Sequence, residues 1–155
     1  MTMLEPGSKA PNLSGVTADG TPLKLSSLRG KWVVVYFYPK DNTPACMSEA
    51  RDFRDLQSQF ESRNTVIIGV SRDTARMHTN FATKQKLTFA LVADTDETWC
   101  NAFDVIHEKV LYGRKYLGIV RSTFLIDPVG RIHQRWSPVK VPGHAMQVLE
   151  SIPPA

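Results

Sequence analysis

The chain has 155 residues, of which 42% are hydrophobic and 22% are charged, and its formal net charge is +4. This composition is typical of one globular domain and excludes disordered and fibrous proteins, so we expect a single domain over residues 1–155. The apolar run from Trp32 to Tyr38 is far too short to cross a membrane, and the first ten residues contain no apolar segment typical of a signal peptide. We therefore expect a cytoplasmic protein without a membrane partner.

The first half of the chain alternates strand patterns with helix patterns. A pair of short strands is expected within residues 11–25, around the turn Ala18-Asp19-Gly20. Runs of β-branched and aromatic residues predict further strands at 32–38, 65–70 and 89–93. Apolar periodicity predicts helices at 44–60 and 74–85.

The second half is less regular. A capping box from Asp94 to Glu97 predicts a short helix that carries Trp99, Cys100 and Phe103. Residues 106–118 have no clean periodicity and are expected to form a long surface loop. A hairpin is expected from 119–126 and 131–136, and a closing helix at 143–152. This order predicts an α/β fold in which helices cover both faces of a sheet.

The basic residues are dispersed along the chain. The densest group is interleaved with apolar residues and glycines and consists of Lys109, Arg114, Lys115 and Arg121. Proteins that bind nucleic acid concentrate such residues on one face or in one run. We therefore expect a mildly basic surface and no nucleic-acid partner.

Cys46 occupies a position that favours a reactive thiol. Thr43 is a good N-cap and Pro44 suits the first helical position, so Cys46 is expected to be the third residue of the helix. Unpaired amides and the positive end of the helix dipole favour a thiolate, which is the nucleophilic form of cysteine. The helix carries an apolar stripe that faces inward, and this stripe places the thiol in a recess. The stripe comprises Cys46, Ala50, Phe53, Leu56 and Phe60. A buried structural cysteine is the alternative interpretation.

The segment around Cys46 resembles a known active-site signature. Pro39-x-x-x-Thr43-x-x-Cys46 matches the signature of peroxiredoxins, and the run from Phe37 to Asp55 is similar to the bacterioferritin comigratory protein (PrxQ) subfamily. Further matches follow in order at Ile68 to Asp73, Leu91 to Asp94 and Gly118 to Asp127. The resemblance extends over residues 6–150 and implies a thioredoxin-like fold, with a central mixed sheet flanked by helices and an N-terminal β-hairpin.

The resemblance also implies a function and a role for each matched residue. Cys46 would be the peroxidatic nucleophile that reduces hydrogen peroxide and organic hydroperoxides and becomes a sulfenic acid. Thr43 would offer its hydroxyl to the thiolate and the peroxide, and Pro39 would shape the pocket and shield the thiol. Arg121 would hold the thiolate and the developing oxyanion. Glu49 could tether the active-site helix or be a solvated surface carboxylate. No cofactor is implied.

The second cysteine departs from the subfamily pattern. Many relatives carry a resolving cysteine five residues after the first, where this chain has Arg51, and the other known location, near 81–86, also has no cysteine. Cys100 remains, and its neighbours Trp99 and Phe103 favour a packing role. Two cycles stay open. Either an external thiol such as thioredoxin, glutaredoxin or glutathione reduces the Cys46 sulfenic acid, or Cys46 pairs with Cys100 after local unwinding.

Other functions compete with this reading. Cys46 could act as the switch of a redox sensor or chaperone, or as a hydrolase nucleophile with a histidine base. The four histidines show no metal-ligand spacing with the cysteines, so no metal site is expected; they are His78, His107, His133 and His144. The resemblance implies a monomer or weak dimer.

Overall fold

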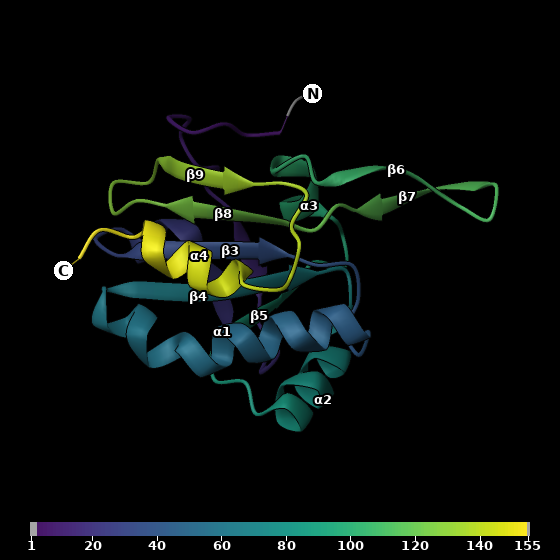
Figure 1. The fold of residues 1–155 in the computed structure, drawn as a ribbon, viewed down its shortest axis with the longest axis horizontal. Helices are drawn as coiled ribbons and strands as arrows, with labels where there is room; N and C mark the ends of the chain where they lie inside the picture. Colours follow the sequence, from purple (N-terminus) through teal and green to yellow (C-terminus); the bar gives the residue numbers. More distant parts are fainter. Residues whose placement is uncertain (1–2, 155) are drawn as a thin grey trace.

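A five-stranded mixed sheet forms the centre of the computed structural model, which describes residues 3–154 of the predicted 1–155 domain and leaves residues 1, 2 and 155 outside the described part. The strand order is β5-β4-β3-β8-β9. Strands β3, β4 and β5 are parallel, and β8 and β9 are antiparallel to their neighbours (Figure 1). The strand bounds are β3 (Trp32–Phe37), β4 (Thr65–Ser71), β5 (Ala90–Ala93), β8 (Ser122–Ile126) and β9 (Ile132–Trp136).

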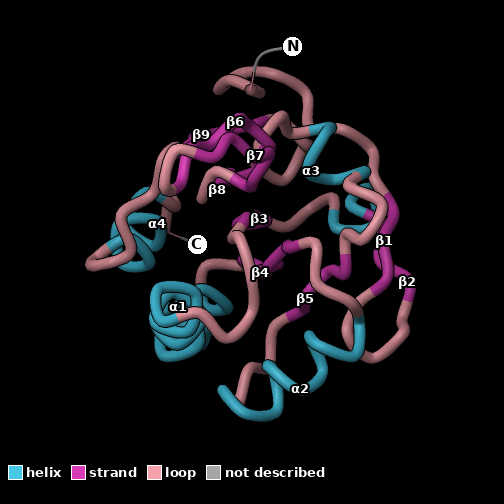
Figure 2. The backbone as a smooth tube through the Cα atoms, turned by 90° about the vertical axis from the view of Figure 1, so that its right-hand side faces the viewer, coloured by secondary structure: helices cyan, strands magenta, loops and turns pink. Residues whose placement is uncertain are grey.

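Two apolar clusters pack against the two faces of this sheet, and Figure 2 shows the elements that cover each face. On one face lie α1 (Pro44–Ser62), α2 (Ala75–Gln85) and α4 (His144–Ser151). On the other lie the β1 (Ser14–Val16) and β2 (Pro22–Lys24) pair, the 3-10 helix η1 (Leu25–Leu28) and α3 (Thr98–Ala102). The predicted apolar stripe of α1 is confirmed, because its five residues all belong to, or pack against, the cluster on the face that α1 covers. The predicted α/β architecture, with helices on both faces and an N-terminal hairpin, is therefore correct.

The expected surface loop at 106–118 is wrong. These residues form a separate hairpin of β6 (Ile106–Leu111) and β7 (Arg114–Ile119) that extends away from the central sheet (Figure 1). Its two-residue turn consists of Tyr112 and Gly113, both with positive φ, as a type I′ turn requires. Most of the side chains remain exposed on both faces of this two-stranded sheet, so the chain carries no simple apolar alternation there.

Two smaller predictions also need correction. The strand expected at 119–126 is broken, because β7 ends at Ile119 and β8 begins at Ser122. At the break, the Val120 amide donates to the Val105 carbonyl. The capping box is absent as well: Glu97 is the N-cap of α3, and the Asp94 carboxylate accepts from the amides of Trp99 and Cys100 instead.

Candidate active site

Cys46 lies in the first turn of α1, as predicted. The helix begins at Pro44, and Thr43 is the N-cap, with extended backbone (φ −91°, ψ 150°). Cys46 is the third helical residue and is only 2% exposed. Its sulfur therefore sits in a recess beneath the helix start, packed within the same apolar cluster as Val34 and Ala50.

The amides at the start of α1 are left without a side-chain cap. The Thr43 hydroxyl donates to the Lys40 carbonyl at 3.1 Å rather than to Cys46 or to the helix. Within residues 3–154, the amides of Ala45 and Cys46 donate to no protein acceptor. They are available to an anion or a polar substrate oxygen beside the sulfur.

Arg121 reaches Cys46 from the far end of the sequence. In the antiparallel β3–β8 ladder Phe37 pairs with Ser122. The segment after β3 and the residue before β8 therefore meet at the same end of these two strands. Arg121 Nη2 donates to Cys46 Sγ at 3.3 Å, and Nη1 donates to Glu49 Oε1 at 2.7 Å. Arg121 itself lies in the break between β7 and β8, so its side chain starts at the end of the sheet where Cys46 lies.

The Cys46–Arg121–Glu49 cluster is largely shielded from water. The side chains of Arg121 and Glu49 are 15% and 2% exposed. Burial lowers the pKa of Arg121, but the Glu49 carboxylate and the Cys46 sulfur outweigh it and raise that pKa. Burial raises the pKa of Glu49 to about 7, because the neighbouring Arg121 only partly offsets the loss of water. Glu49 Oε2 is buried and has no hydrogen-bond partner among the described residues.

Glu49 should therefore impose a pH dependence on stability. Its pKa is raised from 4.5 to about 7 in the folded state, so its contribution is most favourable below pH 4.5 and is lost as the pH rises to about 7. The free energy of unfolding of Glu49→Gln minus that of wild type should rise by about 3 kcal/mol from pH 4.5 to pH 8. Urea denaturation at both pH values measures this gain. Glu150→Gln, an exposed carboxylate on α4, is the control, and an equal gain in both variants would contradict the assignment.

The loop between β3 and α1 is fixed by a buried polar network that the sequence did not reveal. Asp41 Oδ2 lies 2.7 Å from His78 Nδ1, and the Tyr38 hydroxyl donates to Asp41 Oδ1 at 2.7 Å. His78 Nε2 donates to the Val92 carbonyl, which leaves Nδ1 as the ring nitrogen that faces the Asp41 carboxylate. The Asp41 amide in turn donates to Asp73. Half-buried Pro39 lies within this loop, at the point where β3 ends.

Asp41, Asp73 and His78 bring three potential metal ligands within 4.8 Å of one another. Their atoms already bond to protein groups: Ser71 donates to Asp73, and Tyr38 donates to Asp41. The cluster is thus a structural network that holds the loop preceding Cys46. Only Tyr38, which precedes the signature, and Asp41, which lies within it, could have drawn attention to this network, since His78 lies on α2.

Cys100 is separated from Cys46 by the sheet. It belongs to the cluster on the opposite face, with Phe103 and Phe124, and is fully buried. Burial and the nearby Asp94 carboxylate raise the pKa of Cys100 far above its ordinary value. A thiol with these properties is a poor nucleophile toward a sulfenic acid.

The histidines do not supply Cys46 with a base. Within residues 3–154, none of them bonds to its sulfur. His144 packs against Phe53 of α1, but its Nε2 bonds to Thr123, and burial lowers its pKa to about 4. The hydrolase alternative therefore has no geometric support.

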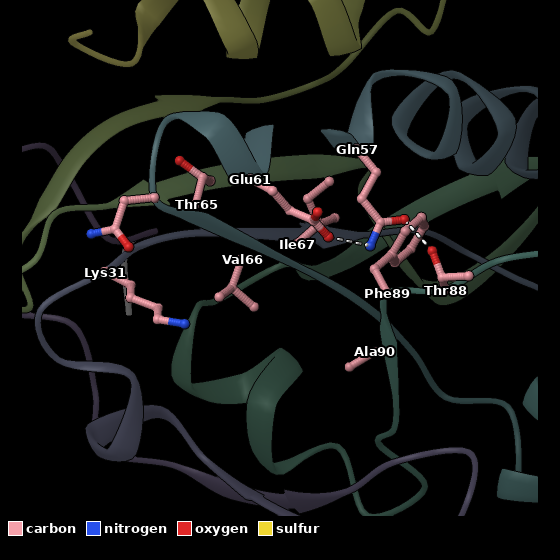
Figure 3. Close-up of a pocket in the computed structure, with 10 residues that line it drawn as sticks. Lys31, Gln57, Glu61, Thr65, Val66, Ile67, Thr88, Phe89 and Ala90 are labelled. Atoms are coloured by element: carbon pink, nitrogen blue, oxygen red, sulfur yellow. Dashed lines mark hydrogen bonds between the residues drawn. The ribbon is translucent and has the colours of Figure 1, made fainter. Parts of the chain in front are cut away.

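Figure 3 shows a surface pocket. It lies at the opposite end of the sheet from Cys46. Its lining includes Lys31 and Thr65, which stand where β3 and β4 begin, whereas Cys46 follows the end of β3. Gln57 bonds to Glu61 and to Thr88 across it. No residue of the Cys46 site lines this pocket.

Comparison with known proteins gives a consistent match. The AhpC/TSA family matches residues 6–135. Peroxiredoxin Bcp of Xanthomonas campestris is 50% identical over 135 residues, which is 87% of this chain and 84% of that protein. Among the described helices, none is long and apolar enough to cross a membrane.

Solved structures give the same answer. A cysteine-to-serine mutant of Xylella fastidiosa PrxQ has a TM-score of 0.92 at 44% identity, covering 97% of this chain and 96% of that one. The bacterioferritin comigratory protein of X. campestris has a TM-score of 0.90 at 45% identity, covering 96% and 97%. That structure concerns its alkyl peroxide reduction activity. The thioredoxin-like fold is confirmed, and the chain belongs to the AhpC/TSA family as a peroxiredoxin of the Bcp (PrxQ) type, a thiol-dependent peroxidase.

Proposed function

We propose that Cys46 reduces hydrogen peroxide and organic hydroperoxides in a one-cysteine cycle that an external thiol completes. The observation that carries this proposal is the Arg121 guanidinium, 3.3 Å from Cys46 Sγ at an uncapped helix start. The alkyl peroxide reduction activity of the X. campestris relative supports the inclusion of organic hydroperoxides.

In the first step, the Cys46 thiolate attacks the terminal oxygen of the hydroperoxide. The O–O bond breaks, an S–O bond forms, and the departing alkoxide or hydroxide takes a proton to leave as alcohol or water. The free amides of Ala45 and Cys46 and the Arg121 guanidinium stabilise the negative charge as it moves from sulfur to oxygen. Glu49 holds the other branch of the guanidinium and so fixes its orientation.

Thr43 and Pro39 complete the proposed site. The Thr43 hydroxyl donates to the Lys40 carbonyl, and we assign it to the peroxide when substrate is bound. Pro39, beside the network around Asp41, limits access of water to the sulfur.

In the second step, the sulfenic acid is reduced by an external thiol. Cys100 is a poor resolving group because it is buried on the opposite face of the sheet. A Cys46–Cys100 disulfide requires Cα atoms about 4.4–6.8 Å apart and therefore extensive movement of α1 or α3.

Removal of Cys100 tests this cycle. Cys100→Ala should retain full peroxidase turnover with thioredoxin or glutaredoxin, since it removes the thiol without placing a hydroxyl in the apolar cluster. Cys46→Ser should lose turnover entirely. Intact mass after one equivalent of peroxide should show the gain of one oxygen atom. A loss of two hydrogens from wild type, together with lost turnover in Cys100→Ala, would establish the two-cysteine cycle instead.

A further inference from the structure

The β6–β7 hairpin carries an unusual share of the exposed apolar surface. Eight large hydrophobic side chains are exposed within residues 3–154, and five belong to this hairpin: Val110, Leu111, Tyr112, Tyr116 and Leu117. The hairpin projects from the body and pairs with no strand of the central sheet (Figure 1). Exposed apolar side chains gathered on one element mark an interaction surface.

The two faces of the hairpin differ in charge. Residues opposite one another in the ladder share a face, and faces alternate along each strand. One face, the paired face, consists of Glu108, Val110, Lys115 and Leu117, and its two charges form an ion pair at 3.8 Å. The other, the basic face, consists of His107, Lys109, Leu111, Arg114 and Tyr116 and contains no Asp or Glu.

The basic face is continuous with the catalytic site. The Lys109 stem and the Tyr116 ring lie over Gly118, where a Cβ atom would meet them at 3.1 and 2.9 Å. The Lys109 ammonium donates to the Ile119 carbonyl, two residues before Arg121. Burial, Arg121 and Arg72 lower the pKa of Lys109, while Cys46 raises it, so the charges of this face and of the site act on each other. At its base, His107 lies 3.8 Å from the Asp104 carboxylate.

We propose that the basic face of the β6–β7 hairpin docks an acidic thiol reductant protein of the thioredoxin or glutaredoxin class, and so delivers its thiol to oxidised Cys46. This inference rests on the proposed one-cysteine cycle. A second copy of this chain is a poorer occupant, because its net charge is +4 and like charges would meet. A membrane is disfavoured because the face leads to a thiol that must exchange electrons with a partner.

The reductant acts by thiol exchange. Its thiolate attacks the sulfur of the Cys46 sulfenic acid, an S–S bond forms, and the S–O bond breaks. The departing hydroxide takes a proton and leaves as water. A second thiol of the reductant then displaces Cys46 as a thiolate, and the reductant carries away the disulfide. Complementary charge at the edge of such an interface chiefly raises the association rate.

Adjacent rungs of the hairpin provide a matched pair of variants. Leu111 pairs with Arg114 on the basic face, and Val110 pairs with Lys115 on the paired face. Leu111→Ser with Arg114→Glu changes the basic face. Val110→Ser with Lys115→Glu also replaces one apolar residue by serine and one cation by glutamate, on the paired face. Both double variants have the same net charge. Each is assayed with an acidic thioredoxin, with an acidic glutaredoxin and with dithiothreitol.

The basic-face variant should lose about tenfold in kcat/KM for the better protein reductant, and the paired-face variant should stay within about twofold of wild type. Dithiothreitol-driven turnover and the rate of Cys46 oxidation should be unchanged in both. Wild-type turnover with the protein should also fall between 50 and 200 mM salt, and the basic-face variant should be less sensitive, as expected for about a 10 Å screening length.

Several results would overturn the docking proposal while leaving the peroxidase intact. These are equal losses in the two variants, no loss in either, or wild-type turnover with dithiothreitol but with neither protein. Two further results would overturn it if turnover with the protein reductant were unaffected in the basic-face variant. These are binding of the wild-type protein to anionic vesicles through the hairpin, and dimerisation that is lost only in the basic-face variant. Absence of turnover with every reductant would contradict the proposed function itself.

Discussion

Replacing Arg121 by glutamine is expected to slow the oxidation of Cys46 by hydrogen peroxide about 10²–10³-fold, the usual cost of losing one donor to developing negative charge. The Arg121 guanidinium donates to Cys46 Sγ, and its second bond, to Glu49, fixes its orientation. Glutamine keeps a donor but removes the charge and the two-branched geometry. Stopped-flow fluorescence or competition kinetics at one pH measures the second-order rate constant.

Two further variants show whether the loss reflects geometry or charge. Arg121→Lys retains the charge without the fork, so its rate should fall between those of wild type and Arg121→Gln. Arg51→Gln removes an exposed cation from the same helix as Cys46 and should leave the rate within about twofold of wild type, because exposed charges contribute little. An Arg121→Gln rate close to that of wild type would remove Arg121 from the catalytic site.

Asp41→Ala is expected to reduce the free energy of unfolding by about 3–5 kcal/mol, because it leaves His78 without its buried partner. Both side chains are fully buried and lie 2.7 Å apart, and the Tyr38 hydroxyl loses its acceptor as well. Urea denaturation at neutral pH, with the m-value compared between variants, measures the change.

Asp41→Asn is the matched control. Its amide can still accept from Tyr38 and can donate to Nδ1 of a neutral His78, so it should lose far less stability than alanine. Equal losses in the two variants would mean that the carboxylate charge, rather than the hydrogen bonds, stabilises the loop. A loss below about 1 kcal/mol in Asp41→Ala would show that the network does not hold the loop in place.

The start of the active-site helix could be predicted because its determinants are local. Thr43 and Pro44 specify where α1 begins, and the apolar stripe specifies which side of it faces the core. The position of Cys46 in the first turn of α1 could therefore be predicted from the sequence alone. The side chain of Thr43 nevertheless does not cap the helix, and its hydroxyl donates to the Lys40 carbonyl within the loop.

The remaining features of the site depend on contacts between distant segments. Arg121 meets Cys46 only because β8 pairs antiparallel with β3, a register that strand patterns do not specify. The separation of Cys46 from Cys100 requires knowing which face of the sheet α3 covers. The β6–β7 hairpin was missed because most of its side chains are exposed on both faces, so burial imposed no periodic signal on its sequence.

The tip of that hairpin has a consequence for the continuity of the chain. Tyr112 is 96% exposed, and Arg114 and Lys115, which follow the turn, are exposed sites for trypsin. A cut there would place Cys46 and Arg121 on different polypeptides. The two pieces would still be joined by the β3–β8 ladder at the centre of the sheet and by the packed cores on both faces. Residues 112–115 are thus the natural position for splitting the protein or for relocating its ends by circular permutation.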